Sequence, residues 1–295
     1  MQPIPDTLCY LNGEYGPLRE AKVSVLDRGF IFGDGIYEVV PAYAGKLFRF
    51  DEHMARLNRS LGKLRIANPH RREEWLERSR ALLAAFMERS QAPAQLVYIQ
   101  VTRGVAPRDH VMPTDVAPTV FMMCSAMKHA TPEQRHAGVA CMSARDFRWE
   151  HGDIKSISLL GNVLARQISA DHGAVETVMF RNGHLTEAAA SNVWVVHEGA
   201  LLGPPKSEHV LEGIRYELIR ELCEEVGIAY NLRPIAEADV FSADELLLSS
   251  ATKEVLPITS LDGQPVGHGA LRGKPGPAYA RLFEAYQRAK AVQSI

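Results

Sequence analysis

The stretch Asp153-Ile154-Lys155-Ser156-Ile157-Ser158-Leu159-Leu160-Gly161-Asn162 places one lysine in a mostly apolar run, directly after the polar cluster 148–153. A lysine beside apolar walls is partly desolvated. Desolvation disfavours its ammonium form and makes its amine available as a nucleophile or proton carrier, as Schiff-base chemistry requires. Spacing alone favours a commoner arrangement, a surface lysine at the start of a helix outlined by Leu159, Val163, Leu164 and Ile168. The role of Lys155 therefore depends on the rest of the chain.

The composition is that of an ordinary globular protein, with 295 residues, 46% hydrophobic and 23% charged, enough for two domains. A net charge of −2 gives no electrostatic basis for binding nucleic acid or an anionic membrane. Apolar runs such as 120–124 are far shorter than the roughly 18 residues of a spanning helix. We therefore expect no nucleic-acid partner and no membrane span.

The N-terminal stretch Met1–Asp6 has neither a basic start nor an apolar signal core, so we expect a cytoplasmic protein. The four cysteines show no CxxC pairing, which favours reduced thiols over disulfides or a zinc site. The eleven histidines show no ligand spacing such as HExxH, so no metal is expected.

Strand and helix patterns alternate along the chain. The strands are expected at 8–11, with a hairpin turn at Asn12-Gly13, and at 36–40, 95–102, 119–124, 139–143 and 176–180. The helices are expected after an N-cap at Asp51, at 72–89, from Gly213 onward and near the C-terminus. The polar stretch 128–136 is typical of a linker. We therefore predict an α/β (α+β type) chain with a small N-terminal α/β domain (1–125), a linker (126–136) and a larger β-rich domain with flanking helices (137–295).

Four stretches, taken in order and spacing, resemble the fold-type IV pyridoxal-phosphate (PLP) enzymes: 27–38 (DRGFIFGDGIYE), 153–156 (DIKS), 185–192 (LTEAAASN) and 249–254 (SSATKE). That group includes branched-chain aminotransferases, D-amino acid aminotransferases and aminodeoxychorismate lyases. The resemblance covers nearly the whole chain. It implies a two-domain fold, bound PLP and a homodimer, since active sites of the group lie at a domain and subunit interface.

The resemblance also implies roles for single residues. Lys155 would hold the cofactor aldehyde and then carry a proton. Glu187 would keep the pyridine nitrogen protonated. Arg56 matches the arginine that holds the phosphate, and the backbone would complete the phosphate cradle at Ile214, Arg215, Ala251 and Thr252. Without the resemblance, the sequence suggests a surface strand end for Glu187 and a solvated helix position for Arg56.

The chain departs from the family pattern in two places. Hydroxyl residues common in the D-amino acid enzymes are replaced by Ala189, Ala190, Arg215 and Ala251, so contacts to the phosphate must come from backbone amides or Thr252. Branched-chain enzymes tend to carry a tyrosine just beyond the lysine, where this chain has Leu159 and Leu160. That difference weighs against a branched-chain enzyme.

The segment 102–110 indicates which substrate is used. Arg108 and His110 stand two apart, so in an extended loop their side chains point the same way and could converge on one anion. The segment resembles the arginine and histidine pair with which D-amino acid aminotransferases hold the substrate α-carboxylate, helped by a tyrosine corresponding to Tyr37. By itself the pattern is more often a solvated charged loop.

The interpretation is transamination between a D-amino acid of the D-alanine or D-glutamate type and a 2-oxo acid such as 2-oxoglutarate or pyruvate. The alternatives are a branched-chain L-amino acid aminotransferase, an aminodeoxychorismate lyase or a non-catalytic binding protein. The presence of both Lys155 and Glu187 argues against the last, because a relic fold has no physical need for either.

Overall fold

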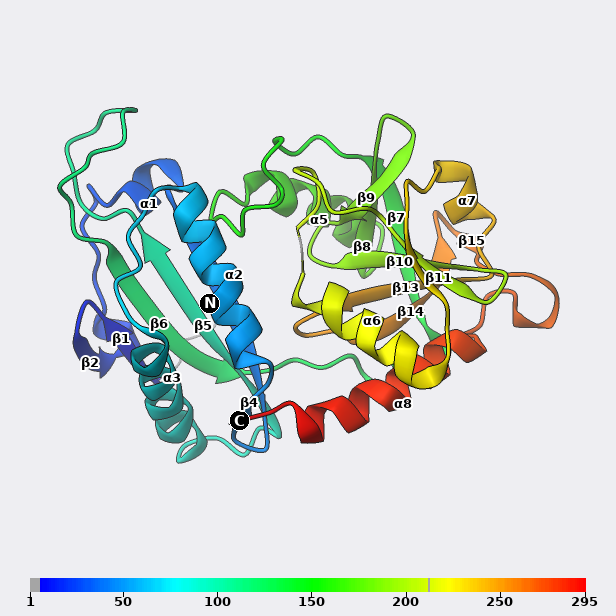
Figure 1. Ribbon diagram of the computed structural model, residues 1–295, viewed down its shortest axis with the longest axis horizontal. Helices are drawn as coiled ribbons and strands as arrows, with labels where there is room; N and C mark the ends of the chain where they lie inside the picture. The colour runs from blue at the N-terminus through cyan, green and yellow to red at the C-terminus, as the bar shows by residue number, and fades with distance from the viewer. Residues whose placement is uncertain (1–5, 212) are drawn as a thin grey trace. The chain divides into compact units, whose positions relative to one another are not determined.

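The computed structural model describes residues 6–211 and 213–295, which form two compact units (Figure 1). One comprises Met1–Met127, Ile154–Leu159 and Gln293–Ile295, and the other Lys128–Asp153 and Leu160–Val292. The expectation that the chain has no signal segment was based on its first residues. Residues 1–5 lie outside the described part of the chain.

This division differs from the contiguous one that the sequence predicts. The chain enters the first unit three times, because the segment with Lys155 and the last three residues both return to it. The predicted linker 126–136 also contains most of a short helix, α4 (Pro132–Ala137). Thr131 caps that helix, accepting a hydrogen bond from the Gln134 backbone N–H, while the Gln134 side chain accepts one from the Thr131 N–H.

The first unit is built on a six-stranded antiparallel sheet with the order β2-β1-β6-β5-β3-β4. Its strands are β1 (Leu8–Leu11), β2 (Glu14–Pro17), β3 (Gly35–Tyr43), β4 (Lys46–Leu47), β5 (Ala94–Thr102) and β6 (Thr119–Ala126). Their alternating burial confirms the predicted strands and the Asn12-Gly13 hairpin, where both residues have positive φ angles (50° and 105°). The C-terminal Ile295 exchanges backbone hydrogen bonds with Leu47 of β4.

Two helices pack on this sheet, α2 (Phe50–Lys63) on β3 and α3 (Arg72–Met87) on β1, β5 and β6, and short α1 (Arg28–Phe32) precedes β3 (Figure 1). The predicted N-cap at Asp51 is wrong, because the N-cap of α2 is Arg49, two residues earlier, in the left-handed conformation. Asp51 is exposed and pairs with Arg72 instead of capping. The helix starts at Phe50 because that ring is buried in the core with Leu57, Trp75 and Leu82.

The second unit is built on a nine-stranded mixed sheet with the order β12-β11-β10-β13-β14-β7-β8-β9, and β15 pairs with β14. The strands are β7 (Val139–Arg145), β8 (Glu176–Arg181), β9 (His184–Ala188), β10 (Asn192–His197), β11 (Ala200–Gly203), β12 (Tyr230–Leu232), β13 (Glu245–Ser250), β14 (Glu254–Leu261) and β15 (Gln264–Pro265). The pairs β14–β7, β7–β8 and β11–β12 are parallel. Most of these strands are buried throughout, as expected of strands covered on both faces.

Among the described residues, α4 contacts β14 of this sheet, and the unit also contains α5 (Leu160–Asp171), α6 (Ile214–Val226), α7 (Glu237–Phe241) and α8 (Pro277–Val292). In α5 the buried residues are Ala165 and Ser169, and it packs on β7 and β8. Its larger apolar residues Leu160, Val163 and Leu164 are 72%, 60% and 52% exposed. The apolar spacing of 159–168 therefore predicts the helix correctly but not the face that this chain buries.

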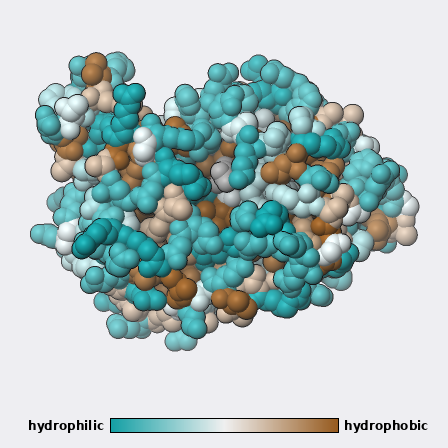
Figure 2. All heavy atoms as spheres, viewed as in Figure 1, coloured by the Kyte–Doolittle hydropathy of each residue, from teal (hydrophilic) through white to brown (hydrophobic). Residues whose placement is uncertain are grey.

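No helix among the described residues is long and apolar enough to cross a membrane. On the face drawn in Figure 2, hydrophilic residues dominate and hydrophobic ones form small separate groups. All four cysteines are buried free thiols. These observations agree with the short apolar runs and the unpaired cysteine spacing of the sequence.

Candidate active site

Lys155 lies in a segment that pairs with the start of β3 in the first unit. The Tyr37 backbone N–H donates to the Lys155 carbonyl at 3.0 Å, and the Ile157 N–H donates to the Gly35 carbonyl at 3.1 Å. Ser156 forms a β-bridge with Ile36. Lys155 is therefore held on a sheet edge, five residues before α5 begins, rather than at a helix start.

Close backbone approach explains the glycines of the 27–38 motif. A Cβ at Gly33, whose φ is +66°, would lie 2.5 Å from the Ser158 Oγ. A Cβ at Gly35 would lie 2.6 Å from the Val101 carbonyl oxygen. Glycine thus lets the Lys155 segment pack against β3.

The Lys155 amine lies over an aromatic wall. Its Nζ atom is 4.0 Å from the centroid of the Tyr37 ring, and that ring stacks on Tyr98 with centroids 5.9 Å apart. Tyr98 donates its hydroxyl hydrogen bond to Gln100 at 2.7 Å, and burial raises the pKa of Tyr98 to about 12. The half-buried lysine therefore has one amine fixed beside one phenol, an arrangement suited to proton carriage.

Arg108 and His110 meet at one ring in the first unit. The Arg108 guanidinium carbon is 5.5 Å from the centroid of the Phe32 ring, and the His110 ring is 5.4 Å from it, centroid to centroid. Arg28 holds their loop by donating to the Asp109 carbonyl. The structure thus brings the two predicted residues together. Among the described residues of the chain, neither makes a hydrogen bond or ring contact with Tyr37 or Lys155.

The base of this loop is an ion cluster. Asp34 accepts hydrogen bonds from Arg28 and Arg103 at 2.7–3.0 Å. Burial by itself would raise the pKa of Asp34, but the two guanidiniums outweigh it and lower that pKa. Both arginines are buried, so the start of the loop is anchored to the end of α1.

Arg56 lies on α2 with two of its three guanidinium nitrogens bonded to Glu38. Its Nε and Nη2 donate to the two Glu38 carboxylate oxygens at 2.7 and 2.8 Å, and His53 Nδ1 lies 2.7 Å from the same carboxylate. Glu38 is fully buried. Burial opposes its ionisation, yet Arg56 and His53 lower its pKa. Glu38 and His53 thereby fix the orientation of the Arg56 guanidinium within the first unit.

Glu187 lies on β9 in the second unit and is 6% exposed. One carboxylate oxygen accepts from Arg148 Nη1, and the other accepts from the Leu211 backbone N–H at 3.2 Å and from Asn192 Nδ2 at 3.4 Å. Burial raises the pKa of Glu187 to about 6, although Arg148 opposes the rise. A buried carboxylate that ionises near neutral pH fits a partner for a ring nitrogen.

Arg148 is a site residue that the sequence reasoning did not single out. Asp146 clamps it, accepting from its Nε at 3.0 Å and its Nη2 at 2.9 Å, and Thr186 donates to the same aspartate. The only signal was its place at the start of the polar cluster 148–153. Sequence spacing of 39 residues gave no indication that it meets Glu187.

Asn192 connects Glu187 to the predicted phosphate cradle. It pairs across the sheet with Ser249. Its Nδ2 donates to the Leu211 carbonyl at 3.3 Å, and a Cβ at Gly213 would lie 2.3 Å from its Oδ1. Asn192 therefore touches the loop before α6 and the strand before Ala251 and Thr252. Its role went unrecognised because the motif suggested only a strand end.

The start of α6 carries no side-chain cap. Gly213 is its N-cap and supplies no side-chain hydrogen bond to the first turn, which includes the backbone N–H groups of Ile214 and Arg215. The Arg215 side chain is buried and its Nη2 donates to the Tyr286 hydroxyl at 2.9 Å. Arg215 can thus contribute its backbone amide, as its lack of a hydroxyl requires.

Ala251 and Thr252 lie in the turn after β13, and Lys253 ties this turn down. The Lys253 N–H donates to the Ser250 hydroxyl, and its Nζ donates to the buried Glu176 at 2.9 Å. Ser191 donates to the same Glu176 oxygen. Asn192 thus connects three features of the second unit: the buried Glu187 carboxylate, the first backbone amides of α6 and the turn at Ala251 and Thr252. These features fit a phosphorylated pyridine.

Comparison with known proteins identifies the family of the chain. The family model for amino-transferase class IV matches residues 35–261. A D-alanine aminotransferase of Staphylococcus haemolyticus is 36% identical over 282 residues, covering 96% of this chain and 97% of that protein. A D-alanine aminotransferase of Bacillus licheniformis is 36% identical over 276 residues, covering 94% of both.

Solved structures show the same fold. An Escherichia coli branched-chain amino acid aminotransferase has a TM-score of 0.86 at 23% identity, covering 96% of this chain and 94% of that one. A branched-chain aminotransferase of the thermophilic archaeon Thermoproteus uzoniensis, solved with norvaline, has a TM-score of 0.84 at 22% identity, covering 97% and 95%. The two-domain fold-type IV architecture is confirmed, and the chain belongs to the class IV aminotransferase family.

Proposed function

We propose that this chain catalyses PLP-dependent transfer of the amino group between a D-amino acid, of the D-alanine or D-glutamate type, and a 2-oxo acid such as 2-oxoglutarate or pyruvate. The observation that carries the proposal is the near full-length similarity to D-alanine aminotransferases. The placement of Arg108 and His110 at one ring supports it independently.

PLP, the cofactor of this family, supplies an aldehyde that binds an amine and a ring that accepts electrons from the substrate Cα. Lys155 provides the amine that holds the aldehyde. Its Nζ would also carry the proton that leaves the substrate Cα to the cofactor carbon C4′, general acid–base work that contributes roughly 10²–10⁴-fold. Tyr37, beneath the Nζ atom, keeps the amine in place.

Glu187 keeps the ring nitrogen protonated. Its carboxylate is fixed by Arg148, Asn192 and the Leu211 N–H, so little reorganisation would be needed for it to accept a hydrogen bond from the protonated ring nitrogen. With its raised pKa of about 6, the Glu187 carboxyl group is closer in pKa to a ring nitrogen than the carboxyl group of an exposed glutamate would be. Glu187 thus sets the charge of the ring without leaving its strand.

In the second unit, the phosphate would be held by the backbone at Ile214 and Arg215 and by the turn at Ala251 and Thr252, and the family resemblance assigns a further contact to Arg56. The helix start supplies N–H groups and the positive end of the helix dipole. The hydroxyl of Thr252 takes over from the serine and threonine contacts that Ala251 and Arg215 lack. Glu38 orients Arg56 for this contact.

Arg108, His110 and Tyr37 are the proposed binding site for the substrate α-carboxylate. Arginine binds a carboxylate through two hydrogen bonds, and the histidine and tyrosine add one donor each. Because Lys155 takes the proton from one side only, the side on which the carboxylate is fixed decides which enantiomer reacts.

A homodimer completes the proposal. Within the described part of one chain, Arg108 and His110 make no hydrogen bond or ring contact with Lys155, and a second subunit can supply them. Large apolar side chains are exposed on both units, as subunit interfaces require: Val25, Phe30 and Val111 are 72–73% exposed and Leu160 is 72% exposed. The free buried thiols agree with a cytoplasmic location.

The decisive experiment is a panel of D- and L-amino acids with 2-oxoglutarate. D-alanine or D-glutamate should react fastest, forming the matching amino acid product stoichiometrically. Faster turnover of L-leucine or L-valine would indicate the branched-chain alternative, and pyruvate release without an acceptor would indicate a lyase. In parallel, borohydride reduction and peptide mapping should find the pyridoxyl group on Lys155; a label elsewhere would exclude its role.

A further inference from the structure

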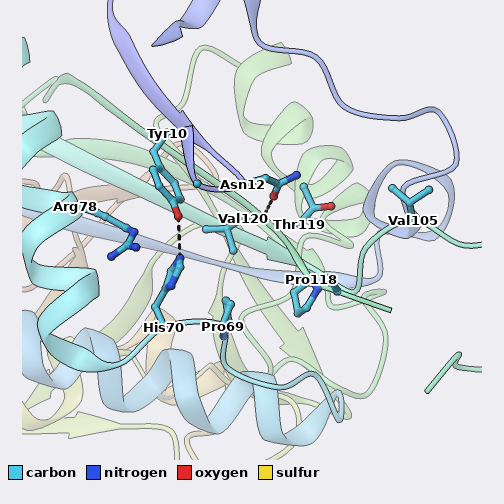
Figure 3. Close-up of a pocket in the computed structure, with 11 residues that line it drawn as sticks. Tyr10, Asn12, Pro69, His70, Arg78, Val105, Pro118, Thr119 and Val120 are labelled. Carbon is cyan, nitrogen blue, oxygen red and sulfur yellow. Dashed lines mark hydrogen bonds between the residues drawn. The ribbon is translucent and has the colours of Figure 1, made fainter. Parts of the chain in front are cut away.

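The first unit contains a cavity of about 660 Å³ that none of the proposed site residues lines (Figure 3). It lies among the β1–β2 hairpin, the segment before α3, α3 itself and the two ends of the 103–118 loop. Its lining residues are Tyr10, Asn12, Gly13, Pro69, His70, Arg78, Val105, Ala117, Pro118, Thr119 and Val120. The volume falls within the ~300–1,000 Å³ typical of small-molecule sites.

Arg78 is a largely buried cation in this wall, and its ion pair with Glu74 is long. Its side chain is 19% exposed, and its Nη2 lies 3.9 Å from the Glu74 Oε1 atom. Its Nη1 donates to the Glu74 backbone carbonyl, while its buried Nε meets no acceptor in hydrogen-bonding geometry among the described residues. A largely buried guanidinium with a spare donor is stabilised by an anion.

Neutral polar groups of Tyr10, His70 and Asn12 line the same cavity as Arg78. The Tyr10 hydroxyl and His70 Nε2 are 3.1 Å apart, and the Arg78 guanidinium carbon is 5.2 Å from the Tyr10 ring centroid, an arrangement visible in Figure 3. Burial, reinforced by Arg78, lowers the pKa of His70, so its ring is neutral at neutral pH. Asn12 accepts from the Val120 N–H through Oδ1, which leaves its Nδ2 as a donor.

The remaining wall is apolar and contains no carboxylate. Pro69, Val105, Ala117, Pro118 and Val120 supply carbon surface that an inorganic anion would leave uncovered. We propose that this cavity binds a small organic carboxylate, with the carboxylate on Arg78 and an apolar body against the prolines and valines. The site is separate from the proposed catalytic residues and does not depend on their assignment.

The test is calorimetric titration of the PLP-loaded full chain with phenylacetate, phenylacetamide and inorganic phosphate. Because the proposed substrate site also binds carboxylates, each titration is repeated on Arg108→Ala. Phenylacetate should bind both proteins, at least tenfold more tightly than its neutral amide or phosphate. That ratio corresponds to ~1.4 kcal/mol.

Two variants locate the binding. Arg78→Gln removes the charge and should weaken phenylacetate at least tenfold. Ala117→Phe places a large ring in the cavity and should abolish phenylacetate binding. Because residue 117 is exposed, this variant should still fold, so it tests the site if Arg78→Gln does not fold. Equal binding of phenylacetamide or phosphate, loss of binding in Arg108→Ala, or unchanged binding in Ala117→Phe would each overturn the proposal.

Discussion

Arg148 and Glu187 form a buried ion pair between residues 39 positions apart, with Nη1 donating to Oε1. Burial raises the pKa of Glu187 to about 6, and Arg148 is the main influence that limits this rise. Arg148 thus decides how much of Glu187 is ionised near neutral pH, without itself needing to touch the cofactor.

Replacing Arg148 by methionine should raise the pKa of Glu187 further, because the largest influence that opposes burial is removed. The carboxylate would ionise only at higher pH, so the acid limb of the kcat/KM profile should move up in pH. At pH 7 the rate should fall at least about tenfold, ~1.4 kcal/mol in the barrier.

The matched variant Glu187→Gln cannot ionise at that position. It should lose well over about tenfold in kcat/KM, with no recovery at high pH. An Arg148→Met enzyme whose activity fell equally at every pH would have lost structure, not charge control, and near-native rates in Glu187→Gln would contradict its role.

Arg108→Ala should lower kcat/KM for D-alanine by ~1.5–3 kcal/mol, the range for hydrogen bonds to charged groups. The side chain is exposed and contacts Phe32, so the fold should tolerate its loss. Steady-state kinetics with Arg19→Ala, an exposed arginine on the first unit, serve as the control. Unaltered kinetics in Arg108→Ala would remove this residue from the carboxylate site.

Glu38 should contribute to stability in a pH-dependent way. Its pKa is lowered in the folded protein, so its contribution is present above its ordinary value of 4.5 and is lost as pH falls below it. Glu38→Gln leaves Arg56 as a buried charge without its partner and should cost ~3–5 kcal/mol at pH 7.

Urea unfolding of the two proteins at several pH values measures this cost. The difference in the free energy of unfolding between wild type and Glu38→Gln should be constant from pH 6 to 8. It should shrink below about pH 4.5. A difference independent of pH down to pH 3 would show that the charge of Glu38 is not what stabilises the pair.

Lys253→Met should weaken cofactor retention. It leaves Glu176, which is fully buried, without its cation and frees the turn that carries Ala251 and Thr252. Breaking such a pair costs ~3–5 kcal/mol, whereas removing both charges costs less. PLP dissociation constants from equilibrium dialysis should therefore worsen in Lys253→Met and partly recover in Lys253→Met with Glu176→Gln. The exposed Lys274→Met is the control, and equal retention in all variants would contradict the role.

Local patterns predicted the regular elements well. The alternation in 95–102 and the Asn12-Gly13 turn depend on neighbouring residues alone, and both are confirmed. Asp51 failed as a cap because a residue distant in sequence, Arg72, takes its carboxylate. Val163 and Leu164 suggested a buried face, but hydrophobic spacing does not distinguish a core from a subunit interface.

Only the site residues that lie in a recognised sequence motif could be predicted from the sequence. Lys155 and Glu187 came from the family resemblance, and the structure adds what holds each one. Arg148, Asn192 and Glu38 act through partners that lie on other elements, so no local spacing revealed them. Their ion pairs depend on the tertiary fold, which a pattern of a few residues does not describe.

The pairing of Ile154–Leu159 with β3 has a consequence for synthesis on the ribosome. The edge of the first sheet at Gly35–Tyr37 has no permanent neighbour until residue 159 has been made, 32 residues after Met127. At about 5–20 residues per second, that interval lasts roughly 2–6 s. During that interval the open strand edge can pair with other nascent chains. The pairing of the Lys155 segment with β3 therefore also protects the first unit from aggregation.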